Sequence, residues 1–145
     1  MIEVKNLVKR YGNHLAVDDL SFTIEKGKIY GVLGPNGAGK TTTMNIITGY
    51  LASTTGDVFV DGHNILEEPD LVKKNIGYLP EQPPVYFDMT VKKYMEFAAE
   101  LKKVPKNQRK QEIEEIMDMV KITDMSNRLI KNLSKGYRQR VGLAQ

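Results

Sequence analysis

The sequence has no cysteine and no tryptophan, and only two of its 145 residues are histidine. The absence of cysteine excludes disulfides, thiolate metal sites and thiol nucleophiles, and two histidines leave few ligands for a zinc site. No apolar run reaches the roughly 20 residues that a membrane-spanning helix needs, and the first residues alternate polar with apolar instead of forming a signal peptide. Any role at a membrane is therefore expected to be peripheral.

The charge balance is also modest, with a formal net charge of +3. Lysine and glutamate are interspersed along the second half of the chain and form no cationic block, so we expect no nucleic-acid partner. The hydrophobic content of 41% and the charged content of 27% are ordinary for a soluble globular protein. At this length, one domain or part of one is expected.

The first half of the chain has the patterns of a sheet. Residues 2–12 and 16–27 alternate apolar with polar residues and end at glycines, which predicts two half-buried antiparallel strands. Residues 28–34, KIYGVLG, are almost continuously apolar and predict a central parallel strand covered on both faces. Residues 56–62 predict a further strand, and residues 74–84 a short strand that runs into a proline-rich loop.

From Thr90 onward the apolar period changes to that of helices. Two stripes are expected to face a core: Val91, Tyr94, Met95, Ala98 and Leu101, then Ile113, Ile116, Met117 and Val120. The chain is thus predicted to be α/β, with a sheet and phosphate-loop core in residues 1–80 and a mainly helical subdomain in residues 81–145.

The segment GPNGAGKT, residues 34–41, fits the phosphate-loop pattern G-x-x-x-x-G-K-[ST], between a predicted strand and a predicted helix. Its glycines let the backbone N–H groups curl toward phosphates, and the helix N-terminus adds partial positive charge. The loop residues are Gly34, Pro35, Asn36, Gly37, Ala38 and Gly39. Lys40 is expected to reach the β- and γ-phosphates, Thr41 to ligate Mg²⁺, and Thr42 to add a phosphate contact.

A phosphate loop alone does not separate a small-molecule kinase, a GTPase and a transport ATPase. Three segments together, residues 11–42, 76–91 and 133–145, resemble the ATP-binding cassette of ABC transporters in order and spacing, over essentially the whole chain. The resemblance implies a P-loop NTPase fold of the cassette type: a small antiparallel sheet, a partial RecA-like core and a helical subdomain. It also implies that the chain ends before the second nucleotide-site strand.

The resemblance suggests roles for residues outside the loop. Tyr11 holds the place where the family stacks an aromatic ring on adenine. The family's glutamine that contacts Mg²⁺ and the attacking water corresponds here to Glu81, with Gln82 one residue late. The implied catalytic residues are therefore Lys40, Glu81 and Gln82, and the implied metal ligands are Thr41 and Glu81, with ATP and Mg²⁺ as cofactors.

The family's signature, Leu-Ser-Gly-Gly-Gln, is LSKGY in this sequence, so Lys135 and Tyr137 depart from it. Ser134 is expected to cap the following helix and, with Gly136, to bind a γ-phosphate held by a second copy in a head-to-tail dimer. Glutamate at position 81 and lysine at position 135 resemble the bacterial exporter subgroup.

These resemblances imply the ATP-binding subunit of an exporter, an ATP hydrolase that couples ATP binding and hydrolysis to transport. It is expected to be cytoplasmic, peripheral on the inner face of the membrane, and bound to a transmembrane permease. The family's catalytic glutamate would follow Gln145, so this chain is expected to bind nucleotide without turnover. The strands that neighbour the phosphate-loop strand in the family would also follow Gln145, so we expect an exposed apolar edge and, with it, self-association or a partly disordered core. The alternatives are a soluble ABC protein of translation or DNA repair, and a non-catalytic nucleotide-binding module.

Overall fold

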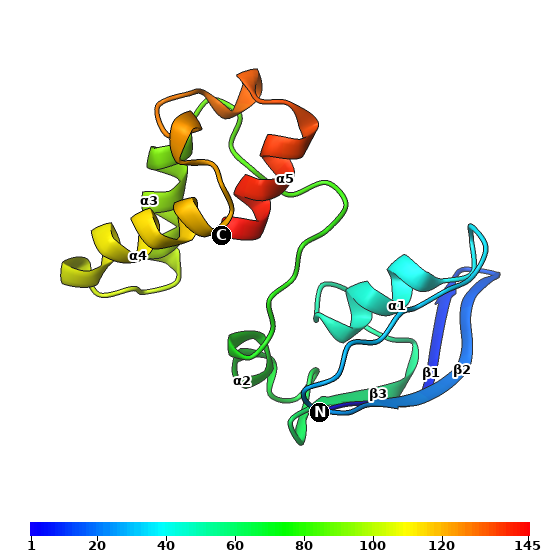
Figure 1. Ribbon diagram of the computed structural model, residues 1–145. Helices are drawn as coiled ribbons and strands as arrows, with labels where there is room; N and C mark the ends of the chain where they lie inside the picture. Colours follow the sequence, from blue (N-terminus) through cyan, green and yellow to red (C-terminus); the bar gives the residue numbers. More distant parts are fainter. The chain divides into compact units, whose positions relative to one another are not determined.

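The computed structural model describes residues 1–145, and the chain divides into two units, Met1–Tyr78 and Leu79–Gln145 (Figure 1). The boundary falls close to the division at residue 80 that the sequence pattern predicts. The positions of the two units relative to one another are not determined.

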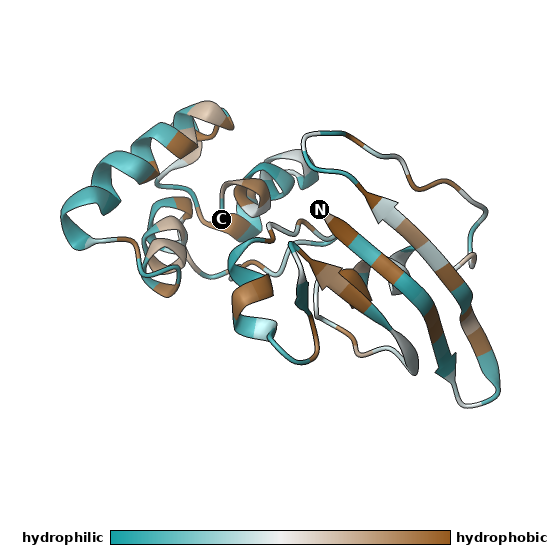
Figure 2. Cartoon of the chain, turned by 90° about the horizontal axis from the view of Figure 1, so that it is seen from below, coloured by the Kyte–Doolittle hydropathy of each residue, from teal (hydrophilic) through white to brown (hydrophobic).

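The first unit contains an antiparallel sheet with the strand order β2-β1-β3-β4. Its strands are β1 (Ile2–Tyr11), β2 (His14–Ile24), β3 (Thr55–Val60) and β4 (His63–Asn64). Apolar and polar residues alternate along β1, as Figure 2 shows by colour, so one face of the strand points into the core. The small antiparallel sheet expected from the sequence is confirmed.

Two helices in the first unit, α1 (Lys40–Ile47) and α2 (Pro69–Lys74), bury residues in the same core as the sheet. The helix expected after the phosphate loop is confirmed as α1, and its end is followed by Gly49 at a φ of 70°. The sequence pattern did not predict α2, a short helix that has proline in its first turn. The buried core residues are Val4, Leu7, Val17, Ile46, Ile47, Val58, Val60, Ile65 and Val72.

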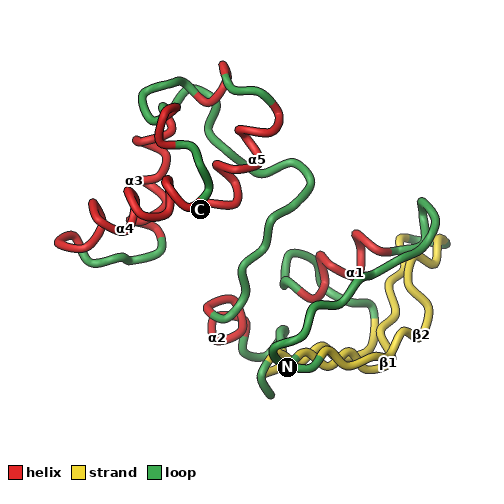
Figure 3. Tube along the Cα trace, viewed as in Figure 1, coloured by secondary structure: helices red, strands yellow, loops and turns green.

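The central strand expected at residues 28–34 does not form, and this prediction is wrong. The segment between β2 and α1 is loop in Figure 3, and the side chains of Ile29 and Leu33 are 102% and 94% exposed. A buried parallel strand needs hydrogen-bonded neighbours and covering layers on both faces, and no strand of the described chain pairs with this one. The short strand expected within residues 74–84 is absent for the same reason.

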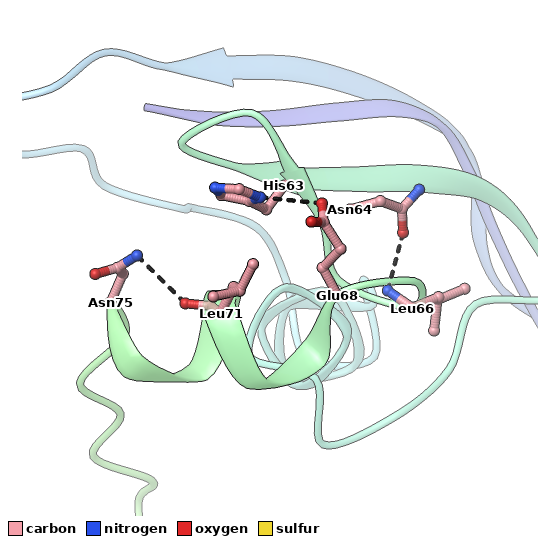
Figure 4. Close-up of polar contacts among 6 residues, drawn as sticks. All are labelled: His63, Asn64, Leu66, Glu68, Leu71 and Asn75. Carbon is pink, nitrogen blue, oxygen red and sulfur yellow. Dashed lines mark hydrogen bonds and ion pairs between the residues drawn. The ribbon is translucent and has the colours of Figure 1, made fainter.

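The turn between β4 and α2 is closed by local polar contacts (Figure 4). Nδ1 of His63 lies 3.0 Å from Oε2 of Glu68, and Oδ1 of Asn64 accepts a hydrogen bond from the Leu66 N–H at 2.9 Å. Nδ2 of Asn64 donates to Asp57 on β3 at 3.0 Å. The buried Asn64 side chain therefore has its hydrogen bonds satisfied and attaches the turn to the sheet.

The second unit is helical, as expected. It contains α3 (Val91–Leu101), α4 (Lys106–Met119), η1 (Thr123–Met125), η2 (Ile130–Asn132) and α5 (Lys135–Ala144). Its buried core is Val85, Val91, Tyr94, Met95, Ile113, Met117, Ile122, Ile130, Leu133, Val141 and Ala144. Leu101, expected in the α3 stripe, is 66% exposed, because it is the last residue of the helix. None of the helices is both long enough and apolar enough to cross a membrane.

Candidate nucleotide-binding site

The phosphate loop, residues 34–41, curls into the N-terminus of α1 in the first unit. Gly37 and Gly39 have φ values of 83° and 78°, and the Ala38 N–H donates to the Pro35 carbonyl at 3.2 Å. The first turn of α1 leaves the N–H groups of Lys40, Thr41 and Thr42 outside the helix's own hydrogen-bond ladder. These free donors and the positive end of the helix dipole form a place for an anion.

Gly39 is the residue that lets this turn pack against the sheet. It is the N-cap of α1 in the left-handed region, and a Cβ at this position would lie 2.3 Å from the Ala16 carbonyl oxygen of β2. It would also lie 3.3 Å from Cγ2 of Val17. Both the backbone conformation and the close approach therefore require glycine here.

The Lys40 side chain folds back over the loop. Its Nζ donates to the carbonyl oxygens of Gly34 and Pro35, each at 2.7 Å. The ammonium is thereby held at the loop entrance, where charge-assisted hydrogen bonds to phosphate oxygens would be stronger than bonds to neutral carbonyls. Thr41 is exposed and Thr42 is half-buried, so the Thr41 hydroxyl is open to a ligand.

A hollow of about 370 Å³ lies beside Lys40 in the first unit. Its lining is mostly apolar and includes Phe22, Val32, Leu33 and Met44. No aspartate, glutamate or histidine lines it.

Tyr11 is the last residue of β1 and is 49% exposed. It pairs with His14 across the turn that joins β1 to β2. Nζ of Lys9 lies 5.2 Å from the centroid of the Tyr11 ring, within cation–π range. The tyrosine expected to stack on a base is thus a partly open aromatic ring and not a core residue.

Glu81 and Gln82 are exposed in the second unit, where they line a groove of about 380 Å³. The opposite side of the groove comes from α5, through Lys135, Arg138 and Gln139. Nε2 of Gln139 donates to the Glu81 carbonyl oxygen. The structure therefore joins the Glu81 segment to the helix that begins at the signature.

Two further contacts attach this segment to the helices. A Cβ on Gly142 of α5 would lie 2.4 Å from Cβ of Pro83, so only glycine allows this approach. The Tyr94 hydroxyl donates to the Pro84 carbonyl oxygen at 3.1 Å. Burial raises the pKa of Tyr94 above its usual range, and the nearby Tyr86 adds a smaller increase. At neutral pH the Tyr94 hydroxyl is protonated and is a donor.

Ser134 caps α5, as the sequence predicts. Its φ and ψ are −64° and 163°, and its side chain accepts a hydrogen bond from the Tyr137 N–H at 3.4 Å. Ser134 and Gly136 are both exposed. Tyr137, at the family's glutamine position, is half-buried and its ring lies 5.5 Å from Cζ of Arg140.

The predicted site residues thus fall into two groups. Tyr11 and residues 34–42 belong to the first unit, and Glu81, Gln82, Ser134 and Gly136 belong to the second. The Mg²⁺ ligands Thr41 and Glu81 lie in different units and stay a prediction. Sequence reasoning missed Lys9, Arg138 and Gln139. Arg138 could have been found from its i,i+4 spacing after Ser134, and Lys9 from its i,i+2 spacing before Tyr11 on a predicted strand, whereas Gln139 had no such signal.

A glycine-rich turn that leads into a helix with lysine and threonine in its first turn defines the class of phosphate-loop nucleotide-binding proteins. The fold aligns with a dimeric bacterial ABC transporter cassette at a TM-score of 0.87 and 27% identity, over 99% of this chain and 68% of that one. The family model for the ABC transporter matches residues 17–145. The chain therefore belongs to the ABC transporter family of ATP-binding proteins.

Curated relatives agree with this assignment. The uncharacterized ABC transporter ATP-binding protein YhcH of Bacillus subtilis is 40% identical over 146 residues, covering 100% of this chain and 47% of the relative. The Fe(3+) ions import ATP-binding protein FbpC of Fusobacterium nucleatum is 33% identical, over 99% of this chain and 38% of the relative. The chain spans about half the length of the first relatives it matches.

Proposed function

We propose that the chain is the ATP-binding part of a transport ATPase subunit. The observation that supports the proposal is the phosphate loop, where the Lys40 ammonium lies against the Gly34 and Pro35 carbonyl oxygens and the first turn of α1 leaves N–H groups without helical partners. MgATP would replace the Gly34 and Pro35 carbonyls as the partner of the Lys40 ammonium. Backbone N–H groups of Gly34 and of residues 36–39 would contact the phosphates, and Thr42 would add a further contact.

The other ATP contacts follow from the exposed side chains. Tyr11 would stack on the adenine ring. Thr41 would supply a hydroxyl and Glu81 a carboxylate to Mg²⁺, which prefers oxygen ligands. The metal would neutralise charge on the β- and γ-phosphates, and Gln82 would be the alternative to Glu81.

A second cassette would complete the site. The exposed N-terminus of α5, with the Ser134 hydroxyl and the N–H groups near Gly136, suits the γ-phosphate bound by another copy. A head-to-tail dimer follows from this arrangement. It is supported by the similar cassette that was solved as a dimer and by a second similar structure, an ATP-binding cassette in a post-hydrolysis state bound to ADP and Pi.

The membrane partner would be a permease, and the subunit would work at the cytoplasmic face of the membrane. Its docking surface would include the exposed aromatic side chains of Tyr86 and Phe87, which follow Glu81 and could report nucleotide state to the partner. We propose export as the direction because Glu81 and Lys135 resemble the exporter subgroup. FbpC, named for iron import, is the relative that argues for the opposite direction.

For these 145 residues we propose nucleotide binding without sustained turnover. The support is the hollow beside Lys40, which has no acidic side chain to activate water. A phosphate-release assay on the purified chain checks this. Turnover that depends on Lys40 would refute the proposal of inactivity and leave the proposal of binding intact.

Calorimetric titration of the 145-residue chain with MgATP tests binding itself. Lys40→Met removes the charged donor, and the affinity should fall at least about tenfold, since a hydrogen bond to a charged group contributes about 1.5–3 kcal/mol. Lys74→Met removes an exposed lysine of α2 and should leave the affinity unchanged. Equal affinities of the wild type and Lys40→Met would overturn the proposed function.

A further inference from the structure

The Lys9 side chain lies between two features of the first unit. Its Nζ is 5.2 Å from the centroid of the Tyr11 ring and donates a hydrogen bond to the Ala52 carbonyl oxygen at 2.8 Å. Lys9 is half-buried, whereas Tyr11 is exposed. The ammonium therefore has a fixed partner on the backbone and stands over one ring face.

The Ala52 segment leads back to the phosphate-loop helix. The Leu51 N–H donates to the Asn45 carbonyl of α1 at 3.0 Å, and the Thr54 N–H donates to the Val8 carbonyl of β1 at 2.8 Å. The Arg10 N–H donates in turn to the Thr54 hydroxyl at 2.9 Å. Lys9 is thus, together with the Thr54 hydroxyl, a side-chain link between the end of β1, which carries Tyr11, and the segment attached to α1.

This link matters for a ring that lies at the end of a strand. An exposed tyrosine is free to rotate about its side-chain bonds, and fixing its orientation before a ligand arrives lowers the entropy cost of binding. A cation over one face favours one ring orientation through the ring quadrupole. The opposite face then stays available for a flat aromatic ligand.

We infer that Lys9 is a positioning residue for the nucleotide base, acting through Tyr11. The inference rests on the proposed function, because it takes a nucleotide as the ligand. Lys9 holds the Tyr11 ring in the orientation that stacks on a purine, and its effect is confined to the base. Phosphate contacts at Lys40 do not depend on it.

The experiment is titration of the 145-residue chain, in the presence of Mg²⁺, with each of two probes. One probe is ATP, and the other is inorganic tripolyphosphate, which has no base. Lys9→Met should weaken ATP binding about two- to fivefold, as expected for an exposed cation–π contact, and leave tripolyphosphate binding unchanged. Lys9→Arg, which keeps the cation, should restore ATP affinity. In a Tyr11→Leu background, Lys9→Met should have no further effect.

The matched control is Lys5→Met. Lys5 also lies over an aromatic ring, with Nζ 4.7 Å from the Phe59 centroid, but it does not contact Tyr11. This variant should bind both probes as the wild type does, and thermal unfolding followed by circular dichroism checks that each variant folds.

The outcomes separate the two proposals. Three results for Lys9→Met would overturn the role of Lys9. They are an equal loss of affinity for ATP and tripolyphosphate, a loss of ATP affinity that persists in the Tyr11→Leu background, and a gain in ATP affinity. If ATP binding depends on Lys40 but is unchanged by Lys9→Met, the role of Lys9 is overturned and the proposed function is not. Binding of neither probe by the wild type would overturn both proposals.

Discussion

Replacing Gly39 by alanine should destabilise the first unit more than a glycine-to-alanine replacement at any other position of the phosphate loop. Gly39 has a φ of 78°, and a Cβ there would lie 2.3 Å from the Ala16 carbonyl oxygen. The contact is with backbone, which cannot rotate away as a flexible side chain could. Strain and overlap therefore act together at this one position.

The magnitude follows from the two parts. An L-residue in the left-handed region costs about 1–2 kcal/mol, and overpacking a filled contact costs about 1–3 kcal/mol. Their sum is about 2–5 kcal/mol, a large fraction of the stability of a typical domain. Gly37→Ala is the matched control, because Gly37 has a similar φ of 83° and nothing within 4 Å of its Cβ position.

The assay is urea denaturation followed by circular dichroism, with amide exchange at α1 and β2 to localise the loss. We expect Gly37→Ala to lose only the strain contribution and Gly39→Ala to unfold at a clearly lower urea concentration. Identical urea midpoints for the two variants would show that the close approach between Gly39 and Ala16 adds nothing to the loss of stability.

Two further predictions concern packing and exposure. Gly142→Ala should destabilise the second unit by about 1–2 kcal/mol, because overlap with the rigid Pro83 ring outweighs alanine's helix preference. Gly136→Ala should not destabilise it, because a Cβ there would meet only the Ser134 Oγ, at an ordinary contact distance of 4.0 Å. Reversal of this order in thermal unfolding would refute the packing argument. Ile29→Ser with Leu33→Ser should reduce self-association in light scattering, since burying each apolar side chain contributes about 1.5–3 kcal/mol. A wild-type chain that is already monomeric, or an equal effect of the control Leu66→Ser, would contradict this.

Local patterns were sufficient for much of the fold. The alternation along β1 and β2, the phosphate-loop spacing before α1 and the Ser134 cap of α5 each depend on neighbours within a few residues. The strand expected at residues 28–34 failed because burial on both faces is a non-local property. Its apolar sequence is compatible with a central strand, but strand pairing needs partners elsewhere in the chain.

By itself, the sequence determined the phosphate loop, the two kinds of unit and the family that its three motifs resemble, because these depend on residue type and spacing along the chain. Only the tertiary structure decided that Gly39 must be glycine for contact with Ala16, that Gln139 holds the Glu81 backbone, and that Lys9 covers Tyr11. The first and second of these contacts join residues far apart in the sequence, and the third depends on the Ala52 carbonyl that fixes the lysine. The contacts of Gly39, Gln139 and the Lys9 ammonium with distant backbone carbonyls arise from packing and have no signature in a linear pattern.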